Sequence, residues 1–332
     1  MATFRNIKLI EDMIIIGPDF RCGISQHAIK YSKMLNCDYF DCKTVLNYQL
    51  PTSDAGLWFH VPNYRFDKYN IDGFRQEIRS KVKHLILYTV CETETVDEAY
   101  RTLFEGFTDI AVPSEFCKRV FCAQFPEYNF HVIFAHIPLP KNKIQFKKEV
   151  YTFYHIGNVL DPRKNFQKVI DAFISLAIPQ TRLLIKNTGP FDVSNFTHNS
   201  IKVINGFFSE EQMDDLHEEG DCYVSFSFSE GVGLGAVEAA MRDKVVIIPS
   251  YGGGAEYIKT EYIISCEKGK VGFDDFLFAK DMIWGQPDYE QLKAFMKDAA
   301  ETDKRFCDHQ YTREKVKKET VLQQFNELIR IP

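Results

Sequence analysis

The sequence has no long block of lysine or arginine, no C-x-x-C pair and no long uninterrupted apolar run. The lack of basic blocks, together with a net charge of −6, argues against a broad nucleic-acid-binding surface. A helix that spans a bilayer needs roughly 18–20 consecutive apolar residues, so we expect none here. The N-terminal segment carries Lys8, Glu11 and Asp12 among its apolar residues and is a poor secretory signal.

The nine cysteines are an odd number and are scattered along the chain. This argues against a zinc ribbon and against a fully paired disulfide framework. Reduced thiols in a cytoplasmic protein are the simplest interpretation. The sequence leaves a peripheral contact with a membrane surface open, and the oligomeric state is not visible in it.

Apolar and aromatic residues are plentiful. Of 332 residues, 45% are hydrophobic, and there are 29 phenylalanines and 16 tyrosines. This composition excludes intrinsic disorder over the whole chain. At about 100–200 residues per domain, the length indicates two domains.

Short apolar runs alternate with amphipathic stretches along the chain, a pattern typical of buried parallel sheets covered by helices. In the first part we expect strands at Met13–Gly17, Leu57–Val61, His84–Val90 and Val132–Ala135, and helices at Ile24–Leu35, Ile71–Val82, Val96–Phe107 and Ser114–Phe121. In the second part we expect strands at Thr152–Ile156, Arg182–Lys186, Lys202–Ile204, Cys222–Phe226 and Val245–Pro249, and helices at Asn165–Leu176, Glu210–Glu218 and Leu234–Met241.

Because the alternation occurs twice, we predict an α/β protein of two doubly wound domains. Residues 136–149 contain two prolines and four lysines and interrupt the strand pattern. We therefore predict an N-terminal domain over residues 1–140 and a C-terminal domain over residues 150–310. Residues 311–332 have a helical spacing of apolar residues, and this helix could pack on either domain.

The most informative stretch is CYVSFSFSEGVGLGAVEAAM, residues 222–241, in which a strand, a loop and a helix from Leu234 follow one another. Three glycines alternate through the turn: Gly231, Gly233 and Gly235. Glycines let a backbone approach a ligand closely, and a helix N-terminus favours an anion such as phosphate. Glu230 and Glu238 flank the turn, and carboxylates are good acceptors for sugar hydroxyls. The plain alternative is a strand–helix turn with two solvated glutamates.

A dinucleotide-binding fingerprint is a rival interpretation of the same turn. Residues Gly231–Ala236 fit G-x-G-x-x-G/A after a strand and before a helix, which would suit an NAD-dependent oxidoreductase. Three features count against it. The next strand ends in Ser250 rather than in an acid for the ribose, the motif lies late in the chain, and the Glu230/Glu238 pair is left unexplained.

A second cluster, GNVLDPRKN at residues 157–165, follows the first strand of the C-terminal domain and opens a helix. Arg163 and Lys164 lie there near a helix N-terminus, where the helix dipole disfavours cations. Their placement makes sense if an anion binds to them. The alternative is a solvated basic pair.

Taken in order, these segments resemble the retaining glycosyltransferases of family 4, which have the GT-B fold. The resemblance covers roughly residues 151–259 and consists of a Lys after the first donor-domain strand, a Gly turn with an acidic helix, the pattern S-x-x-E-G-x-G-x-x-x-x-E-A, and the loop YGGGAEYI. It implies two Rossmann-like domains facing across a cleft. It also implies transfer of a hexose-type sugar from a nucleoside diphosphate sugar to a hydroxyl of a glycan, a lipid or a protein-linked sugar, with retention of the anomeric configuration.

The resemblance also implies roles for individual residues. Lys164, and less directly Arg163, would stabilise the charge on the departing diphosphate. Glu230 would bind the hydroxyls of the donor sugar and Glu238 the ribose. Further donor-binding positions are Gly231, Gly233, Leu234, Gly206 and Phe207, the last two beside the nucleobase. Lysine can neutralise the diphosphate and the sequence has no D-x-D motif, so we expect no metal site and no tightly bound cofactor.

The N-terminal domain matches the family more loosely. The family's first loop usually has two adjacent glycines, and here Cys22 precedes Gly23, so the resemblance carries over only Gly23, as a further donor-binding position. Where many members have a histidine, this chain has Val90, Cys91 and Glu92, so His60 and Glu92 are the acceptor-side candidates.

A catalytically inactive GT-B binding protein is a further alternative. Departures from the family pattern at Cys22, Cys91 and Asn158 favour it. The retention of Lys164 together with both glutamates argues against it, because an inactive protein has no need of all three.

Overall fold

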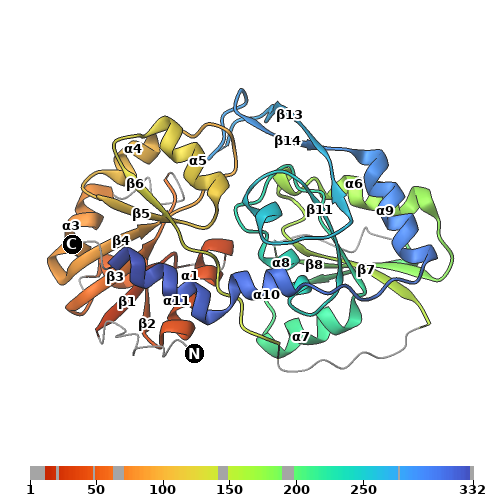
Figure 1. Ribbon diagram of the computed structural model, residues 1–332, viewed down its shortest axis with the longest axis horizontal. Coiled ribbons are helices and arrows are strands. Elements are labelled where there is room, and N and C mark those ends of the chain that lie inside the picture. The colour runs from red at the N-terminus through yellow and green to blue at the C-terminus, as the bar shows by residue number, and fades with distance from the viewer. Residues whose placement is uncertain are drawn as a thin grey trace, which may run out of the picture. The chain divides into compact units, whose positions relative to one another are not determined.

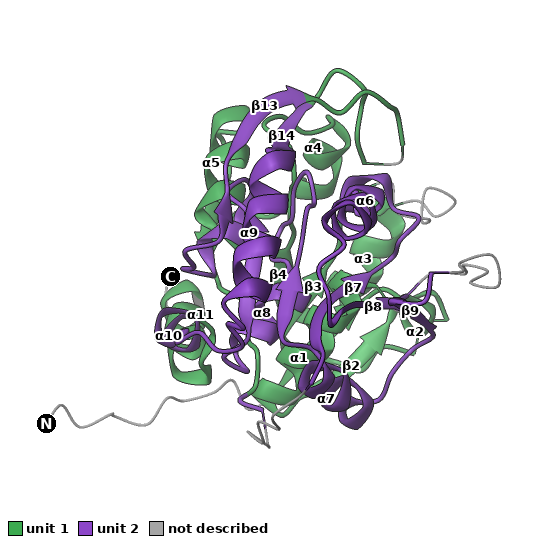
Figure 2. Cartoon of the chain, turned by 90° about the vertical axis from the view of Figure 1, so that its right-hand side faces the viewer, with its two compact units in different colours: residues 1–138, 270–282, 316–332 green, residues 139–269, 283–315 purple. Residues whose placement is uncertain are grey.

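The computed structural model describes residues 12–19, 22–47, 49–62, 71–140, 149–188, 198–275 and 277–329. The chain divides into two compact units (Figure 2). Unit 1 contains residues 1–138, 270–282 and 316–332, and unit 2 contains residues 139–269 and 283–315.

Unit 1 is built on a six-stranded parallel sheet with the strand order β2-β1-β3-β4-β5-β6 (Figure 1). Its strands are β1 (Met13–Gly17), β2 (Asp38–Asp41), β3 (Ser53–Phe59), β4 (Val82–Tyr88), β5 (Asp109–Val112) and β6 (Asn129–Val132). Its helices are α1 (Gly23–Leu35), α2 (Cys42–Leu46), α3 (Ile71–Lys81), α4 (Ala99–Phe104), α5 (Glu115–Gln124) and α11 (Lys318–Ile329).

Alternate residues of β3 point to opposite faces of this sheet, as the two-residue period of a strand requires. Leu57 and Phe59 belong to a core cluster with side chains of α1 and α11. Trp58 instead packs on Phe74 of α3, with ring centroids 5.5 Å apart. Both faces of the sheet are therefore covered by helices, which is why the central strands β3 and β4 are apolar over residues 55–59 and 85–88.

Unit 2 repeats the same plan, with the strand order β12-β11-β10-β7-β8-β9 and parallel pairing throughout. Its strands are β7 (Tyr151–Gly157), β8 (Thr181–Asn187), β9 (Ile201–Asn205), β10 (Cys222–Val224), β11 (Val245–Pro249) and β12 (Ile263–Ile264). Its helices are α6 (Phe166–Leu176), α7 (Glu210–Glu219), α8 (Leu234–Ala240), α9 (Tyr289–Glu301) and α10 (Gln310–Val316), and a two-stranded sheet pairs β13 (Cys266–Lys270) with β14 (Ile283–Pro287).

The main core of unit 2 lies between the sheet and the pair α6 and α9. The residues of β7 show how the two faces are divided. Phe153 belongs to this core, whereas the neighbouring Tyr154 contacts His217 of α7 on the other side. This division matters for the site, because α7 and α8 come to share one face of the sheet.

The predicted fold class, two parallel-sheet α/β units, is confirmed. The two expected sheets are present, and β11 has the predicted bounds. β2 and β5 were not expected from the sequence. Each has only four residues, and β2 is a half-exposed edge strand with an aspartate at either end, so neither gives a clear apolar run. The helix α9 and the sheet of β13 and β14 were also missed.

The boundaries of the two units differ from those of the two domains that we expected from the sequence. The predicted linker lies partly outside the described residues, which stop at 140 and resume at 149. The predicted C-terminal helix is divided into α10, which belongs to unit 2, and α11, which packs on unit 1. Residues 270–282 fall inside the predicted C-terminal domain but group with unit 1. Within the described ranges, no helix has the length and apolar character needed to cross a membrane.

Candidate functional site

The loops that carry the predicted donor-site residues of unit 2 begin where the parallel strands end. Gly157 ends β7, Asn187 ends β8 and Gly206 follows β9. Glu230 lies in the loop after β10, and Gly252 lies in the loop after β11. Open parallel α/β sheets bind ligands at this carboxyl edge, because the loops that leave neighbouring strands meet there.

Glu230 lies at the centre of these loops and is bound by two cations. Lys164 Nζ is 2.5 Å from Glu230 Oε1, and Arg163 Nη1 is 3.2 Å from Oε2. The hydroxyl of Ser227 also donates to Oε1, over 2.8 Å. Only 20% of the Glu230 side chain is exposed, and the two cations are similarly covered. The structure therefore brings together the three residues that the sequence predicted as catalytic.

The charge state of Glu230 follows from these contacts. Burial works against its charged form, but the charges of Lys164 and Arg163 and the hydrogen bonds from Lys164 and Ser227 outweigh it and lower the pKa to about 2. Glu230 is consequently a carboxylate at neutral pH. It can accept hydrogen bonds from hydroxyl groups, but it is not a proton donor.

Arg163 braces the loop that carries Glu230. Besides its contact with Glu230, its guanidinium donates to the carbonyl oxygen of Ser229 at 3.0 Å and pairs with Asp161 at 3.1 Å. The carbonyl oxygen of Arg163 in turn accepts from the backbone N–H of Phe228. The turn after β7 and the loop after β10 are thus tied together by side chain and backbone.

The glycine-rich loop after β11 supports Glu230 from behind. Gly252 has a φ of 86°, and a Cβ there would lie 2.8 Å from the hydroxyl of Ser229 and 2.9 Å from the carbonyl oxygen of Glu230. The N–H of Gly254 donates to that same carbonyl. Only glycine suits position 252, because the backbone is left-handed there and there is no room for a side chain.

Asn187 joins the ends of three strands. Its Oδ1 accepts from the N–H of Val159 in the turn after β7, and its Nδ2 donates to Asn205 at the end of β9. Its carbonyl oxygen accepts from the N–H of Gly206. Asn187 is fully buried, so these bonds are shielded from water and fix the turn at residues 157–160 relative to Gly206.

Glu238 belongs to a second cluster on α8. Its carboxylate lies 3.7 Å from Nε2 of His217 on α7. Burial, and to a lesser extent the charges of Glu230 and Glu238, raise the pKa of Tyr223. The hydroxyl of Tyr223 donates to the carbonyl of Ile156 at 3.3 Å.

The remaining predicted donor-side residues line the same edge. Gly231 is buried, Gly233 is the N-cap of α8 with a φ of 70°, and Leu234 begins that helix. Gly206 has a φ of 129° and open space around it, and the adjacent Phe207 is 56% exposed. A large apolar ring so exposed at a ligand-binding edge offers a surface for a planar group. α8 has only seven residues, so we assign charge stabilisation here to Lys164 and Arg163 rather than to its dipole.

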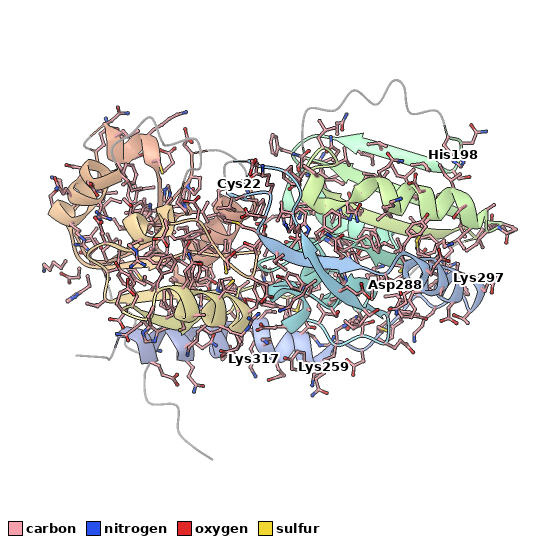
Figure 3. All side chains as sticks on the ribbon, turned by 90° about the horizontal axis from the view of Figure 1, so that it is seen from above. Cys22, His198, Lys259, Asp288, Lys297 and Lys317 are labelled. Atoms are coloured by element: carbon pink, nitrogen blue, oxygen red, sulfur yellow. The ribbon has the colours of Figure 1, made fainter. Side chains whose placement is uncertain are left out.

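Three predicted site residues lie in unit 1: Gly23, predicted to bind the donor, and the acceptor-side candidates His60 and Glu92. Gly23 is the first residue of α1, capped by Cys22, which is labelled in Figure 3. His60 is buried and stacks on Trp58 with ring centroids 4.9 Å apart, and burial lowers its pKa to about 3. Glu92 is half-buried in the loop after β4. The donor role of Gly23 and the acceptor role of His60 and Glu92 stay predictions.

Two residues of the site, Asn187 and His217, were not singled out from the sequence. Asn187 had a usable signal, because it directly follows an expected strand. His217 had none, since only the packing of α7 against α8 brings it to Glu238. Among the described residues no group of His, Cys, Asp and Glu is arranged to hold a metal ion.

Residues 139–270 match the family model described as glycosyl transferases group 1. That segment holds Lys164, Glu230 and Glu238 together with the loop after β11. No curated protein sequence matches the chain.

Solved structures are similar to the chain in fold. The sucrose-phosphate synthase of Thermosynechococcus elongatus has a TM-score of 0.62 at 11% identity, with 96% of this chain and 98% of that chain covered. The lipopolysaccharide outer core galactosyltransferase WaaB in its apo form has a TM-score of 0.59 at 10% identity, with the same coverage. The pneumococcal O-GlcNAc transferase GtfA in complex with UDP and GlcNAc has a TM-score of 0.60 at 15% identity, with 87% of this chain covered. The present chain spans only 60% of that last protein. The fold is GT-B.

Proposed function

We propose that the protein is a retaining glycosyltransferase of family 4. It transfers a hexose-type sugar from a nucleoside diphosphate sugar to an acceptor hydroxyl on a glycan, a lipid or a protein-linked sugar. The observation that carries the proposal is the cluster of Lys164, Arg163 and Glu230 at the carboxyl edge of the unit 2 sheet. This cluster lies inside the segment that matches glycosyl transferases group 1.

Lys164 is assigned to the departing diphosphate. The main barrier to transfer is the negative charge that builds on the leaving group, and a fixed cation stabilises that charge without reorganisation. Lys164 is 17% exposed and already held by Glu230, so its ammonium group is positioned before the donor binds. Arg163 contributes positive charge to the same region and holds the turn after β7 against the loop after β10.

Glu230 is assigned to the hydroxyls of the donor sugar. Its low pKa keeps it anionic, which suits a hydrogen-bond acceptor. A carboxylate also favours the positive charge that the sugar ring gains as its bond to the diphosphate breaks. Glu230 should therefore act more strongly in the transition state than in the ground state.

Glu238 is assigned to the ribose, and Gly206 with Phe207 to the nucleobase. These groups do not change during transfer, so their contacts bind donor and transition state equally. Two similar structures, those of the pneumococcal transferase and of Staphylococcus aureus TarM, are complexes with UDP. UDP-sugars are therefore the first donors to test.

The two glutamates can be separated by experiment. Glu238→Ala should weaken binding of free UDP, because the ribose contact is present without the sugar. Glu230→Ala should bind UDP about as well as the unaltered protein but should lower kcat as well as kcat/KM. Titration calorimetry with UDP, alongside turnover assays, measures both. Loss of UDP affinity in Glu230→Ala alone would mean that the donor lies in the opposite orientation.

The proposal as a whole is tested by thermal shift against UDP-, GDP- and ADP-sugars. A donor at one hundred times its Kd should stabilise the protein by about 2.7 kcal/mol. NMR of the product then gives the anomeric configuration, and retention requires that it equal that of the donor. A protein that no nucleotide or nucleotide sugar stabilises would contradict the donor-site assignment.

Two further features belong to the proposal. Lys164 supplies positive charge at the diphosphate, so transfer should continue in the presence of EDTA. None of the nine cysteines is in a disulfide, which supports a cytoplasmic location, with or without a peripheral membrane contact.

A further inference from the structure

His217 lies at the end of a short polar chain that leads to Glu238. It is fully buried on α7, and its Nδ1 is 2.9 Å from the hydroxyl of Tyr154 on β7. Its other nitrogen, Nε2, has no hydrogen-bond partner. That nitrogen lies 3.7 Å from a carboxylate oxygen of Glu238, which is beyond hydrogen-bond distance.

The carboxylate of Glu238 decides which nitrogen of His217 carries the proton, because the hydroxyl of Tyr154 can either donate to Nδ1 or accept from it. If Nδ1 donated to the hydroxyl of Tyr154, Nε2 would present a lone pair to the carboxylate of Glu238. If the hydroxyl donates to Nδ1, Nε2 carries the hydrogen and presents a donor to that carboxylate. The second arrangement is electrostatically favourable. Burial is the main cause that lowers the pKa of His217, so the ring acts as a neutral donor.

Tyr154 is held firmly in this arrangement. A Cβ on Gly220, at the end of α7, would lie 2.2 Å from the Tyr154 ring, so the ring occupies the space of the missing side chain. The ring also packs edge-on against Tyr223, with centroids 5.2 Å apart. Its hydroxyl oxygen is therefore fixed beside Nδ1, where the hydroxyl can donate to that nitrogen while Nε2 presents its hydrogen to Glu238.

We infer that His217 is a positioning residue for Glu238. When a ribose engages one carboxylate oxygen of Glu238, a small rotation of the carboxyl group brings the other oxygen within reach of the Nε2–H of His217. The buried donor then gains its missing partner, and the carboxylate is held in the orientation that accepts the ribose hydroxyls. An unpaired buried donor is costly, so this closure favours the nucleotide-bound state. The inference rests on the proposed function, because it takes the ribose to be the ligand of Glu238.

The test uses the full chain and the tightest-binding member of UDP, GDP and ADP, with its 2′,3′-dideoxy analogue as the matched probe. His217→Leu removes the donor and should weaken binding of the ribonucleotide about tenfold, while the dideoxy nucleotide binds as it does to the unaltered protein. His217→Gln places an amide nitrogen near the position of Nε2 and should restore most of the affinity. His217→Asn reaches only the position of Nδ1 and should not.

Turnover gives a second measurement. The ribose contact is equally strong in the ground state and in the transition state. His217→Leu should therefore raise the donor KM and leave kcat within about twofold. In a Glu238→Ala background, His217→Leu should have no further effect on nucleotide affinity. Equal weakening of both nucleotides, or an unchanged affinity for the ribonucleotide, would overturn the inference. If His217→Leu fails to fold, the contrast between His217→Gln and His217→Asn decides.

The outcomes also separate this inference from the proposed function. If the unaltered protein binds none of the three diphosphates, the proposed function fails. If it binds one of them but does not distinguish the dideoxy analogue, the ribose assignment of Glu238 fails, and the inference fails with it. If it does distinguish them and His217 has no influence, only the inference about His217 fails.

Discussion

Glu230 is the residue on which most contacts of the candidate site converge. Two cations and a hydroxyl bind its carboxylate, and the backbone of the loop after β11 holds its carbonyl. The resemblance to family 4 led us to expect Glu230, Lys164 and, less directly, Arg163 in one donor site, and each lies in a loop that follows a strand at the same edge of the sheet. What was not predicted is that both cations would bind this one carboxylate.

Replacing Lys164 with alanine should lower kcat by about 10²–10³, the usual cost of losing one preorganised charge-stabilising group. Glu230 would keep its contacts with Arg163 and Ser227, so the loop should remain in place. Steady-state assays with saturating donor measure the effect. The control is Lys297→Ala, which removes the same charge from an exposed position on α9 (Figure 3) and should leave kcat unchanged. An unaltered kcat in folded Lys164→Ala would move the catalytic role to another residue.

The low pKa of Glu230 predicts a pH-dependent contribution to stability. A carboxylate whose pKa is about 2 in the folded protein and near 4.5 when unfolded stabilises the fold above pH 4.5. This contribution, on the order of 3 kcal/mol, is lost as the pH falls from 4.5 toward 2. Glu230→Gln should therefore be less stable than the unaltered protein at pH 6, and the gap should narrow steadily as the pH approaches 2.

Urea unfolding at several pH values measures this gap. Each unit has one of the two tryptophans, Trp58 in unit 1 and Trp284 in unit 2. In a Trp58→Phe background the fluorescence of Trp284 reports on unit 2, and Trp284 stacks on Phe228 close to the site. A stability gap that stays constant from pH 6 to pH 3 would mean that these contacts do not lower the pKa of Glu230 in the folded protein.

At the scale of elements, α8 is placed by a close approach to the strand beneath it. A Cβ on Gly235, in the first turn of α8, would lie 2.6 Å from the hydroxyl oxygen of Tyr223 and 3.1 Å from the carbon that carries it. The glycine therefore lets the helix that carries Glu238 lie directly on the β10 tyrosine. From the sequence we expected Gly235 to let the backbone approach a ligand, whereas in the structure it makes room for the packing of α8 on Tyr223.

Gly235→Ala should destabilise unit 2 by about 1–3 kcal/mol, because crowding outweighs the gain in helix propensity. Tyr223→Phe removes the oxygen, so the same glycine change should cost less in that background. Chemical unfolding of the four proteins of this cycle gives the coupling. Gly23→Ala is the matched control, since it also lies at a helix start but has open space around its Cβ. A stabilising Gly235→Ala would show that α8 can shift away from Tyr223.

Elements with a clear run or periodic pattern of apolar residues could be predicted from the sequence. Elements that depend on tertiary contacts could not. Residues 245–249 are five consecutive buried positions, and the sequence predicted β11 with its observed bounds. β2 was missed because its edge position leaves its residues half-exposed. The chain from Tyr154 through His217 to Glu238 was missed for a related reason: its residues come from three elements, and no local pattern joins them.

At the scale of the whole molecule, unit 1 is assembled from separate parts of the chain. Its sheet comes from the first 138 residues, but α11, near the C-terminus, completes its core. Four buried apolar side chains of α11 pack there: Val321, Leu322, Phe325 and Leu328. Because the sequence showed only that this segment is helical, it could not say which unit the helix would cover. We therefore expect a fragment of residues 1–140 not to fold stably, since its sheet would expose the face that α11 covers.

Phe325→Ala tests this assembly in the intact chain. The side chain is 2% exposed and packs against Tyr31 with ring centroids 5.6 Å apart, so its loss should destabilise unit 1 by about 3–5 kcal/mol. Trp58 fluorescence in a Trp284→Phe background should show an earlier urea transition, whereas Trp284 in a Trp58→Phe background should not. Phe306→Ala, at a half-exposed phenylalanine of unit 2, is the control and should change neither. Equal shifts of both reporters would mean that the two units unfold together, and that α11 stabilises the whole chain rather than unit 1 alone.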